Sequence, residues 1–144
     1  MNPVSLALIL HAHQPIGNFD DVIEISYRTA YLPFLDCLER HPAIAVGLHY
    51  SGILLQWIER HHPAYLTRLR KLREAGRVEI LGGGFYEPIL ISIPEADRRE
   101  QLQRMRDYIH IRFGEAPRGV WLTERVWEPS LPEKIGRASC RERV

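Results

Sequence analysis

Short apolar runs of strand length alternate along the chain with segments that have helical periodicity. The runs cover residues 4–10, 44–50, 78–81 and 120–122, and helical patterns separate them. Strands that alternate with helices are typical of a parallel sheet with helical crossover connections. The alternation therefore predicts an α/β fold built from four β/α units.

The length of the chain limits what these units can form. A parallel β/α barrel takes about 200 residues or more, whereas this chain has 144. Four units therefore make half a barrel or a small open sheet, and the pattern does not separate the two. Half a barrel would leave an unpaired strand edge and an uncovered apolar face, which favours aggregation of the isolated chain.

Several residues carry signals for the ends of helices. Ser51 is placed to cap a helix, and Ser92 with Glu95 has the spacing of a capping box. Gly76 and Gly114 follow helical patterns, where a left-handed glycine commonly ends a helix. We therefore expect helices to begin near the serines and to end at the glycines.

Composition favours a folded protein that binds neither nucleic acid nor membranes. Hydrophobic residues make up 45% and charged residues 26% of the chain, and the net charge is +1. There is thus no sign of disorder and no electrostatic argument for an anionic partner. The run at residues 4–10 lacks the flanks of a signal peptide and is far shorter than the roughly 20 residues of a membrane span. We expect a buried strand there and a cytoplasmic location.

The last residues do not continue the alternating pattern. Residues 134–144 have no apolar periodicity and carry four basic residues against one acidic. Residues 135–144 also match the translation of a common short-read sequencing adapter in one reading frame. We therefore divide the chain into a folded segment over residues 1–133 and a non-native tail over residues 134–144, with a genuine basic tail as the alternative.

Polar and aromatic side chains follow all four predicted strands. Parallel α/β folds gather functional groups beyond the carboxyl ends of their strands. Chance would place one such group, whereas four consecutive strand ends indicate a site. The residues are His11, His13, His49, Tyr50, Tyr86, Glu87, Glu124, Arg125 and Trp127.

Glu79 lies within the third predicted strand. The alternation of side chains along a strand turns it away from its apolar neighbours Val78 and Ile80. An unpaired buried carboxylate is costly, so on a buried face Glu79 would need a partner such as histidine or arginine. The alternative is a surface position on an edge strand.

His11 and His13 lie two residues apart in an extended segment, so they point the same way. The pair suits ligation of a metal, as in barrel metallohydrolases, or hydrogen bonds to substrate hydroxyls. The later strand ends offer no compact second group of ligands, which favours a site without a metal or other cofactor. The glycines at 82–84 lack the pattern of a phosphate-binding loop and indicate a tight turn close to a ligand.

Three segments resemble the first three conserved regions of glycoside hydrolase family 57. They are residues 11–15 (HAHQP), 76–81 (GRVEIL) and 121–126 (WLTERV), and their order and separation also match. The resemblance covers residues 4–132. It looks closest to the 4-α-glucanotransferases and α-amylases that act on α-1,4-glucans.

The resemblance implies roles for particular residues. It matches Glu124 to the catalytic nucleophile, and it matches four residues to the adjoining sugar subsite: His11, His13, Glu79 and Trp121. The fold it implies is an incomplete, seven-stranded parallel β/α barrel, of which this chain supplies about the first four units. The acid/base aspartate of the family belongs to a later motif that this chain does not contain.

Other side chains near these motifs suit the same role. Tyr86, Trp121 and Trp127 offer flat apolar faces to sugar rings, although aromatic residues are more often part of a core. Arg125 would help to keep Glu124 ionised if the two side chains point the same way, because a nearby cation lowers the pKa of a carboxyl group.

The sequence therefore favours the N-terminal part of a retaining enzyme that acts on an α-glucan or maltooligosaccharide. Because only the nucleophile side is present, we expect no turnover by this chain alone. Two other classes stay open: a metal-dependent hydrolase that uses His11 and His13, and a non-catalytic carbohydrate-binding module.

Overall fold

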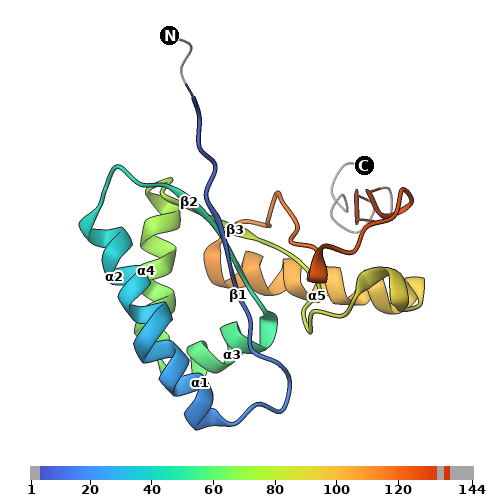
Figure 1. Cartoon of the computed structure of the whole chain (residues 1–144), viewed down its shortest axis with the longest axis horizontal. Coiled ribbons are helices and arrows are strands. Elements are labelled where there is room, and N and C mark those ends of the chain that lie inside the picture. Colours follow the sequence, from blue (N-terminus) through green and yellow to red (C-terminus); the bar gives the residue numbers. More distant parts are fainter. Residues whose placement is uncertain (1–3, 133–134, 137–144) are drawn as a thin grey trace.

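The computed structural model describes residues 4–132 and 135–136. At its centre lies a parallel sheet of three strands in the order β1-β2-β3 (Figure 1). The strands are β1 (Ile9–Ala12), β2 (Val46–Tyr50) and β3 (Val78–Leu81). Three of the four predicted strands therefore form, and they pair in the predicted parallel sense.

Helices connect the strands and follow the last one, as the alternation predicts. Figure 1 shows α2 beside α4, and the two helices are in contact. The elements are α1 (Asp20–Ser26), the π-helical η1 (Tyr27–Tyr31), α2 (Leu32–Arg40), α3 (Gly52–His61), α4 (Pro63–Glu74), the 3₁₀ turn η2 (Leu90–Ser92), α5 (Glu95–Phe113) and the 3₁₀ turn η3 (Thr123–Arg125).

One face of the sheet packs against the helices and forms the core. Leu48 and Ile80 point to this face and are 3% and 5% exposed. They join Leu69 of α4 and Met105 of α5 in one hydrophobic cluster. Burial of an aliphatic side chain of this size stabilises the fold by about 1.5–3 kcal/mol. We call this the covered face; its residues are Val46, Leu48, Tyr50, Val78 and Ile80.

The opposite face of the sheet is open to solvent near the start of the strands. Because side chains alternate along a strand, this open face carries Ile9, His11, Gly47, His49, Glu79 and Leu81. Ile9 is 51% exposed and Glu79 is also exposed. A hollow of about 280 Å³ runs over this part of the face, lined by Ile9, Gly47 and Glu79 among others.

The prediction of a buried strand over residues 4–10 is wrong. The strand begins at Ile9, and Val4 and Leu6 before it are 95% and 89% exposed. Within the described residues, β1 is an edge strand that pairs only with β2. Apolar composition alone does not bury a segment when no neighbour lies against it.

The prediction of a fourth strand over residues 120–122 is also wrong. That segment makes one isolated parallel bridge, between Gly82 and Val120. The backbone N–H of Trp121 donates to the Gly82 carbonyl at 2.8 Å. The chain then turns into η3 at Thr123, which ends the pairing. A barrel is therefore not visible in the described part of the chain.

The predicted helix ends are confirmed at the glycines but not at the capping box. Gly76 and Gly114 follow α4 and α5 with φ of +71° and +83°. Glu95 is the first residue of α5, and no side chain caps this helix. A capping box requires the glutamate at the third helical position, so Ser92 and Glu95 do not form one.

No helix in the described ranges is both long and apolar enough to cross a bilayer. Most of the predicted tail, residues 134 and 137–144, lies outside the described residues, as does residue 133. Ile135 packs at the margin of a small second cluster formed by Leu90, Leu102 and Leu131.

Candidate active site

Two histidines meet where β1 and β2 end. His11 lies opposite His49 in the strand register, and their Nδ1 atoms share a hydrogen bond of 2.9 Å. His13 follows two residues after His11, and its ring stacks at 6.0 Å from that of His11. The structure thus brings together three imidazoles from neighbouring strand ends.

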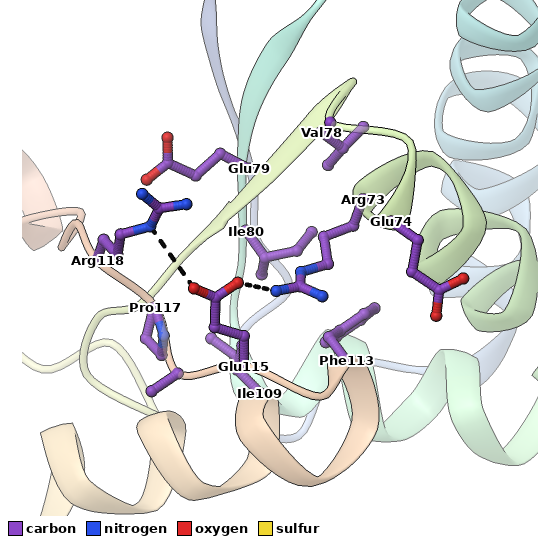
Figure 2. Close-up of a pocket in the computed structure, with 12 residues that line it drawn as sticks. Arg73, Glu74, Val78, Glu79, Ile80, Ile109, Phe113, Glu115, Pro117 and Arg118 are labelled. Carbon is purple, nitrogen blue, oxygen red and sulfur yellow. Dashed lines mark hydrogen bonds and ion pairs between the residues drawn. The ribbon is translucent and has the colours of Figure 1, made fainter.

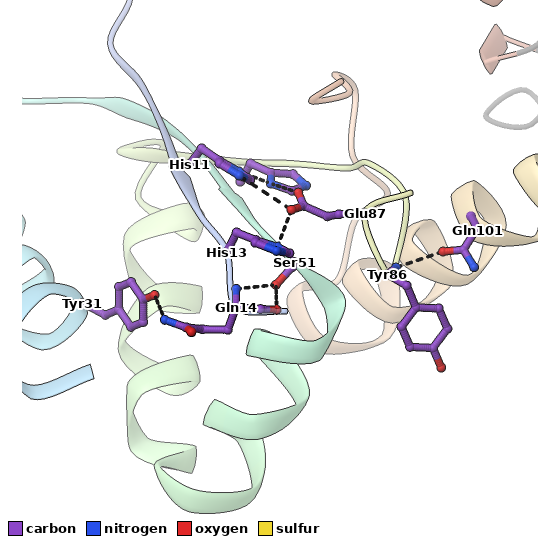
Figure 3. Close-up of polar contacts among 9 residues, drawn as sticks. His11, His13, Gln14, Tyr31, Ser51, Tyr86, Glu87 and Gln101 are labelled. Atoms are coloured by element: carbon purple, nitrogen blue, oxygen red, sulfur yellow. Dashed lines mark hydrogen bonds and ion pairs between the residues drawn. The ribbon is translucent and has the colours of Figure 1, made fainter. Parts of the chain in front are cut away.

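Glu87 reaches these histidines from the turn that follows β3. Figure 3 shows its carboxylate facing the imidazoles. One carboxylate oxygen of Glu87 contacts His13 Nδ1. The Glu87 oxygens also lie 3.3 Å from His49 Nδ1 and 3.7 Å from His11 Nε2. The Glu87 side chain is only 4% exposed. One buried carboxylate therefore links all three histidines.

The segment after His13 is held in place by polar contacts. The Gln14 backbone N–H donates to Ser51 Oγ at 3.3 Å, and Gln14 Nε2 donates to the Tyr31 hydroxyl at 3.0 Å (Figure 3). Ser51 precedes α3 as predicted, but it holds this segment and does not cap the helix. These bonds fix the backbone that carries His13.

Burial sets the charge of the cluster. Burial, together with the negative charge of Glu124, raises the pKa of Glu87 from 4.5 to about 7. Burial and the neighbouring histidines lower the pKa of His49 from 6.5 to about 3. The pKa values of His11 and His13 are lowered too, chiefly by burial. The histidines are therefore neutral near pH 7, so their contacts with Glu87 do not join two opposite charges.

Trp121 covers the histidines on one side. Its ring stacks on His11 with centroids 4.7 Å apart and planes at 10°. Beneath it, Gly83 passes so close to His49 that a Cβ atom at this position would lie 2.6 Å from Nε2. The glycine turn was predicted to approach a ligand, and this stays a prediction; within the protein the turn approaches His49.

Glu124 lies in η3, exposed, beside this cluster. Its charge acts on Glu87, His11 and His13. Its backbone is left-handed, with φ of +54°, and Arg125 follows at +56°. No ion pair joins Arg125 to Glu124 in the described residues, so the role predicted for Arg125 stays a prediction.

Two predicted site residues lie apart from the histidines. Glu79 is exposed on the open face and forms no ion pair within the described chain, so a burial-driven need for a partner does not arise. Tyr86 points away from the imidazoles in Figure 3 and packs under Arg104, whose guanidinium is 4.8 Å from the ring centroid. Trp127, which was expected to offer a flat face to a sugar ring, is 57% exposed.

Three side chains have the arrangement of a metal site. The ligand atoms of His11, His49 and Glu87 all lie within 4.8 Å of one another. Nitrogens on a zinc ion at about 2.0–2.1 Å in a tetrahedral site are roughly 3.3 Å apart. The Nδ1 atoms here are 2.9 Å apart, a hydrogen-bond distance, so the two rings are joined without an ion.

A hollow of about 350 Å³ lies elsewhere, between the start of β3 and the end of α5. Figure 2 shows Glu115 in it, paired with Arg73 and, at 3.8 Å, with Arg118. The histidines do not line this hollow. Arg73 and Arg118 both pair with Glu115 there, while Glu74 and Glu79 also line the hollow and form no ion pair with either arginine.

Sequence reasoning assigned no role to His49 or Glu87, although both were noted at strand ends. The signal was present: the β1 and β2 histidines had to align if the strands paired in register. What was missing was the fold of the 84–87 turn, in which Glu87 takes φ of +53°. That conformation turns Glu87 toward the site and Tyr86 away from it.

Comparison with known proteins gives the chain a family. A model of glycosyl hydrolase family 57 matches residues 7–139. The chain belongs to this family. The resemblance identified from three short segments is therefore confirmed over most of the sequence.

Relatives in family 57 are considerably longer than this chain. α-Amylase 1 of Dictyoglomus thermophilum is 44% identical over 135 residues, which cover 94% of this chain and 20% of the relative. The 4-α-glucanotransferase of Thermococcus litoralis is 44% identical over 138 residues, covering 96% of this chain and 21% of the relative. The chain thus spans about a fifth of their length.

Solved structures agree with the family. The crystal structure of the Thermococcus litoralis 4-α-glucanotransferase matches with a TM-score of 0.88 at 45% identity, over 92% of this chain and 21% of that one. A family 4 carbohydrate esterase from Streptomyces lividans matches with a TM-score of 0.62 at 14% identity, over 96% of this chain and 61% of that one. The second likeness shows a shared fold alone.

Proposed function

We propose that this chain is the nucleophile-bearing part of a retaining enzyme that cleaves or transfers α-1,4 linkages in α-glucans. One observation carries the proposal: Glu124 acts electrostatically on His11, His13 and Glu87. Relatives of the chain bear the names α-amylase and 4-α-glucanotransferase. A solvent-accessible carboxylate beside polar and aromatic side chains suits one of the two carboxyl groups that glycosyl transfer uses.

The proposed chemistry needs two carboxyl groups. Glu124 attacks the anomeric carbon and forms a glycosyl-enzyme, while an acid about 5–5.5 Å away protonates the leaving oxygen. That acid then activates the acceptor. With water as the acceptor the product is a hydrolysed glucan, and with a glucan hydroxyl it is a transferred one.

Glu87 is a poor candidate for the second carboxyl group. Its side chain is 4% exposed and is held against His13, so a leaving oxygen would have no access to it. We propose that an aspartate in a longer form of the protein supplies the acid/base. The sheet would then be the first part of an incomplete seven-stranded barrel, with the open face toward its interior.

The remaining predicted residues fit a sugar subsite to different degrees. Trp121 stacks on His11 and places an aromatic ring at the site. The His13 side chain is partly exposed. Glu79 shares the open face with His11 and His49, so in a closed barrel it would face the same interior. Tyr86 lies outside this arrangement, and we assign it no contact with the sugar.

The nucleophile assignment is tested by Glu124→Gln in a protein that carries the whole catalytic region. Removal of a nucleophile costs at least about a thousandfold in kcat, and the variant should form no covalent adduct with a fluorinated glucosyl probe, as measured by mass spectrometry. Glu74→Gln, on the exposed surface of α4, is the matched control and should keep full activity. Near-normal turnover by Glu124→Gln would refute the assignment.

The 144-residue chain should by itself show no cleavage of maltoheptaose, because its described residues place no accessible second carboxyl group beside Glu124. Product analysis by chromatography after prolonged incubation checks this. Turnover by highly purified chain, absent from a parallel Glu124→Gln preparation, would contradict it.

A metal-dependent hydrolase is the second candidate, and the closeness of His11, His49 and Glu87 is the observation that favours it. It predicts stoichiometric metal in the purified protein and loss of activity with a chelator. Full activity of the complete catalytic region in excess chelator would eliminate it. We place it second because the His11–His49 hydrogen bond accounts for the short distance.

A further inference from the structure

We propose that Glu87 is a positioning residue: it fixes the proton positions of His11 and His13, so that His13 alone turns an unprotonated ring nitrogen to the ligand. The assignment follows from the group that lies against each ring nitrogen and from the one nitrogen that is buried without a partner. The part that concerns the ligand rests on the proposed function.

His49 gives the starting point. Its Nε2 atom is buried and has no hydrogen-bond partner among the described residues, and Gly83 lies directly against it. A buried N–H without an acceptor is rarer in proteins than a bare acceptor atom. The proton of His49 therefore resides on Nδ1, which donates to His11 Nδ1 at 2.9 Å.

His11 must then carry its own proton on Nε2. Its Nδ1 atom is occupied as an acceptor from His49, and a neutral imidazole has one N–H. The Nε2 atom lies 3.7 Å from a Glu87 oxygen, which is beyond hydrogen-bond distance but places a carboxylate on that side of the ring. Trp121 stacks on the His11 ring, and both His11 nitrogens face protein groups, although the side chain is 28% exposed.

His13 is oriented the other way round. Its Nδ1 atom contacts the same Glu87 oxygen, so an ionised Glu87 draws the His13 proton to Nδ1. The Nε2 atom is left as an acceptor on a side chain that is 37% exposed. We infer that this atom accepts a hydrogen bond from a glucan hydroxyl. His11 instead stacks with the rings of His13, His49 and Trp121.

The tautomers can be observed directly by ¹⁵N NMR of the histidine side chains in the 144-residue chain, at pH 8.5 where Glu87 is ionised. We expect His49 and His13 as Nδ1–H and His11 as Nε2–H. Nε2–H on His13 would overturn the proposal in the unmodified protein. An unprotonated Nδ1 on both His11 and His49 would also overturn it, and would favour the metal site.

Two variants test the dependence on Glu87. Glu87→Gln keeps a carbonyl acceptor and should keep His13 as Nδ1–H. Glu87→Met has similar volume but no oxygen, so His13 should revert largely to Nε2–H, the form that free histidine prefers. If Glu87→Met folds by circular dichroism and His13 stays Nδ1–H, then Glu87 does not set it. If it fails to fold, the unmodified spectrum above decides the question.

Titration with maltoheptaose tests the ligand contact. A shift of the His13 Nε2 signal that exceeds the shift of either His11 nitrogen supports it. A larger shift at His11 overturns the assignment of His13. If neither moves while the tautomers are as expected, the ligand part fails together with the proposed substrate, and the role of Glu87 in positioning survives separately.

Discussion

The two faces of the three-stranded sheet differ in what they contribute. On the covered face, Leu48 and Ile80 are almost fully buried against helices. On the open face, Ile9 and Glu79 are exposed, and only His49 near the strand ends is enclosed. The covered face holds the fold together, and the open face carries two histidines of the candidate site, His11 and His49. The comparison predicts that stability and site geometry respond to different sets of substitutions.

The largest expected difference is between two aliphatic residues of the same sheet. Leu48→Ala removes buried methyl groups from the covered face and should lower the free energy of unfolding by about 2–5 kcal/mol. Ile9→Ala, on the open face, should lower it by less than about 1 kcal/mol. Urea denaturation followed by circular dichroism measures both. Equal losses would break the comparison.

Two glycines give a sharper test of where the open face becomes tightly packed. Gly83→Ala would place a Cβ atom 2.6 Å from His49 Nε2, and overpacking of this kind costs about 1–3 kcal/mol. Gly47→Ala meets the exposed Ile9 side chain at 3.2 Å and Leu81 at an ordinary contact distance of 3.8 Å, and should change stability by no more than about 0.5 kcal/mol. Thermal unfolding at one pH compares them; similar melting temperatures would contradict the packing at Gly83.

The last comparison concerns pH, because two enclosed groups of the site titrate in opposite senses. Between pH 4.5 and about 7, Glu87 is protonated in the folded chain and ionised in the unfolded chain. The contribution of Glu87 to the free energy of unfolding therefore falls as pH rises through this range. Between about pH 3 and pH 6.5, His49 is protonated in the unfolded chain and neutral in the folded chain. The contribution of His49 to the free energy of unfolding therefore grows as pH rises through this range. The two oppose each other where the windows overlap.

Glu87→Gln removes one of these opposing contributions. The unfolding free energy of the variant should therefore rise more steeply between pH 4.5 and 6.5 than that of the unmodified chain, by up to about 1.4 kcal/mol per pH unit. His11 and His13 also face Glu87, and their lowered pKa values act in the same direction as that of His49; Glu124 is the remaining charge nearby. Parallel curves for the two proteins would contradict the assignment, and Glu74→Gln serves as the control.

The parts of the fold that sequence predicted depend on local signals. The strands β2 and β3 have apolar runs bounded by clear breaks, and Gly76 and Gly114 end helices at positive φ. The exposure of residues 4–8 and the single bridge at Val120 depend on what lies beside those segments in space. No periodicity within the segments themselves carries that information.

The site was predictable to a similar extent. The placement of polar groups at strand ends predicted the neighbourhood of His11, His13 and Glu124. It did not distinguish Tyr86 from Glu87, because the two differ only in how one tight turn directs consecutive side chains. Backbone conformation at a single residue, Glu87 at φ of +53°, makes that choice.

The left-handed backbone at Glu87 and Glu124 has a consequence for how such a gene varies. Glycine adopts this conformation freely, whereas other residues there carry strain of about 1–3 kcal/mol. A glutamate codon becomes a glycine codon by one base change, so drift toward glycine is open at both positions. At the exposed Glu124 it meets little resistance from folding, whereas at Glu87 it would also remove a buried side chain that contacts three histidines. Retention of glutamate at position 124 would therefore measure selection on the proposed reaction, and its loss to glycine in a related gene would mark a well-folded protein released from that reaction.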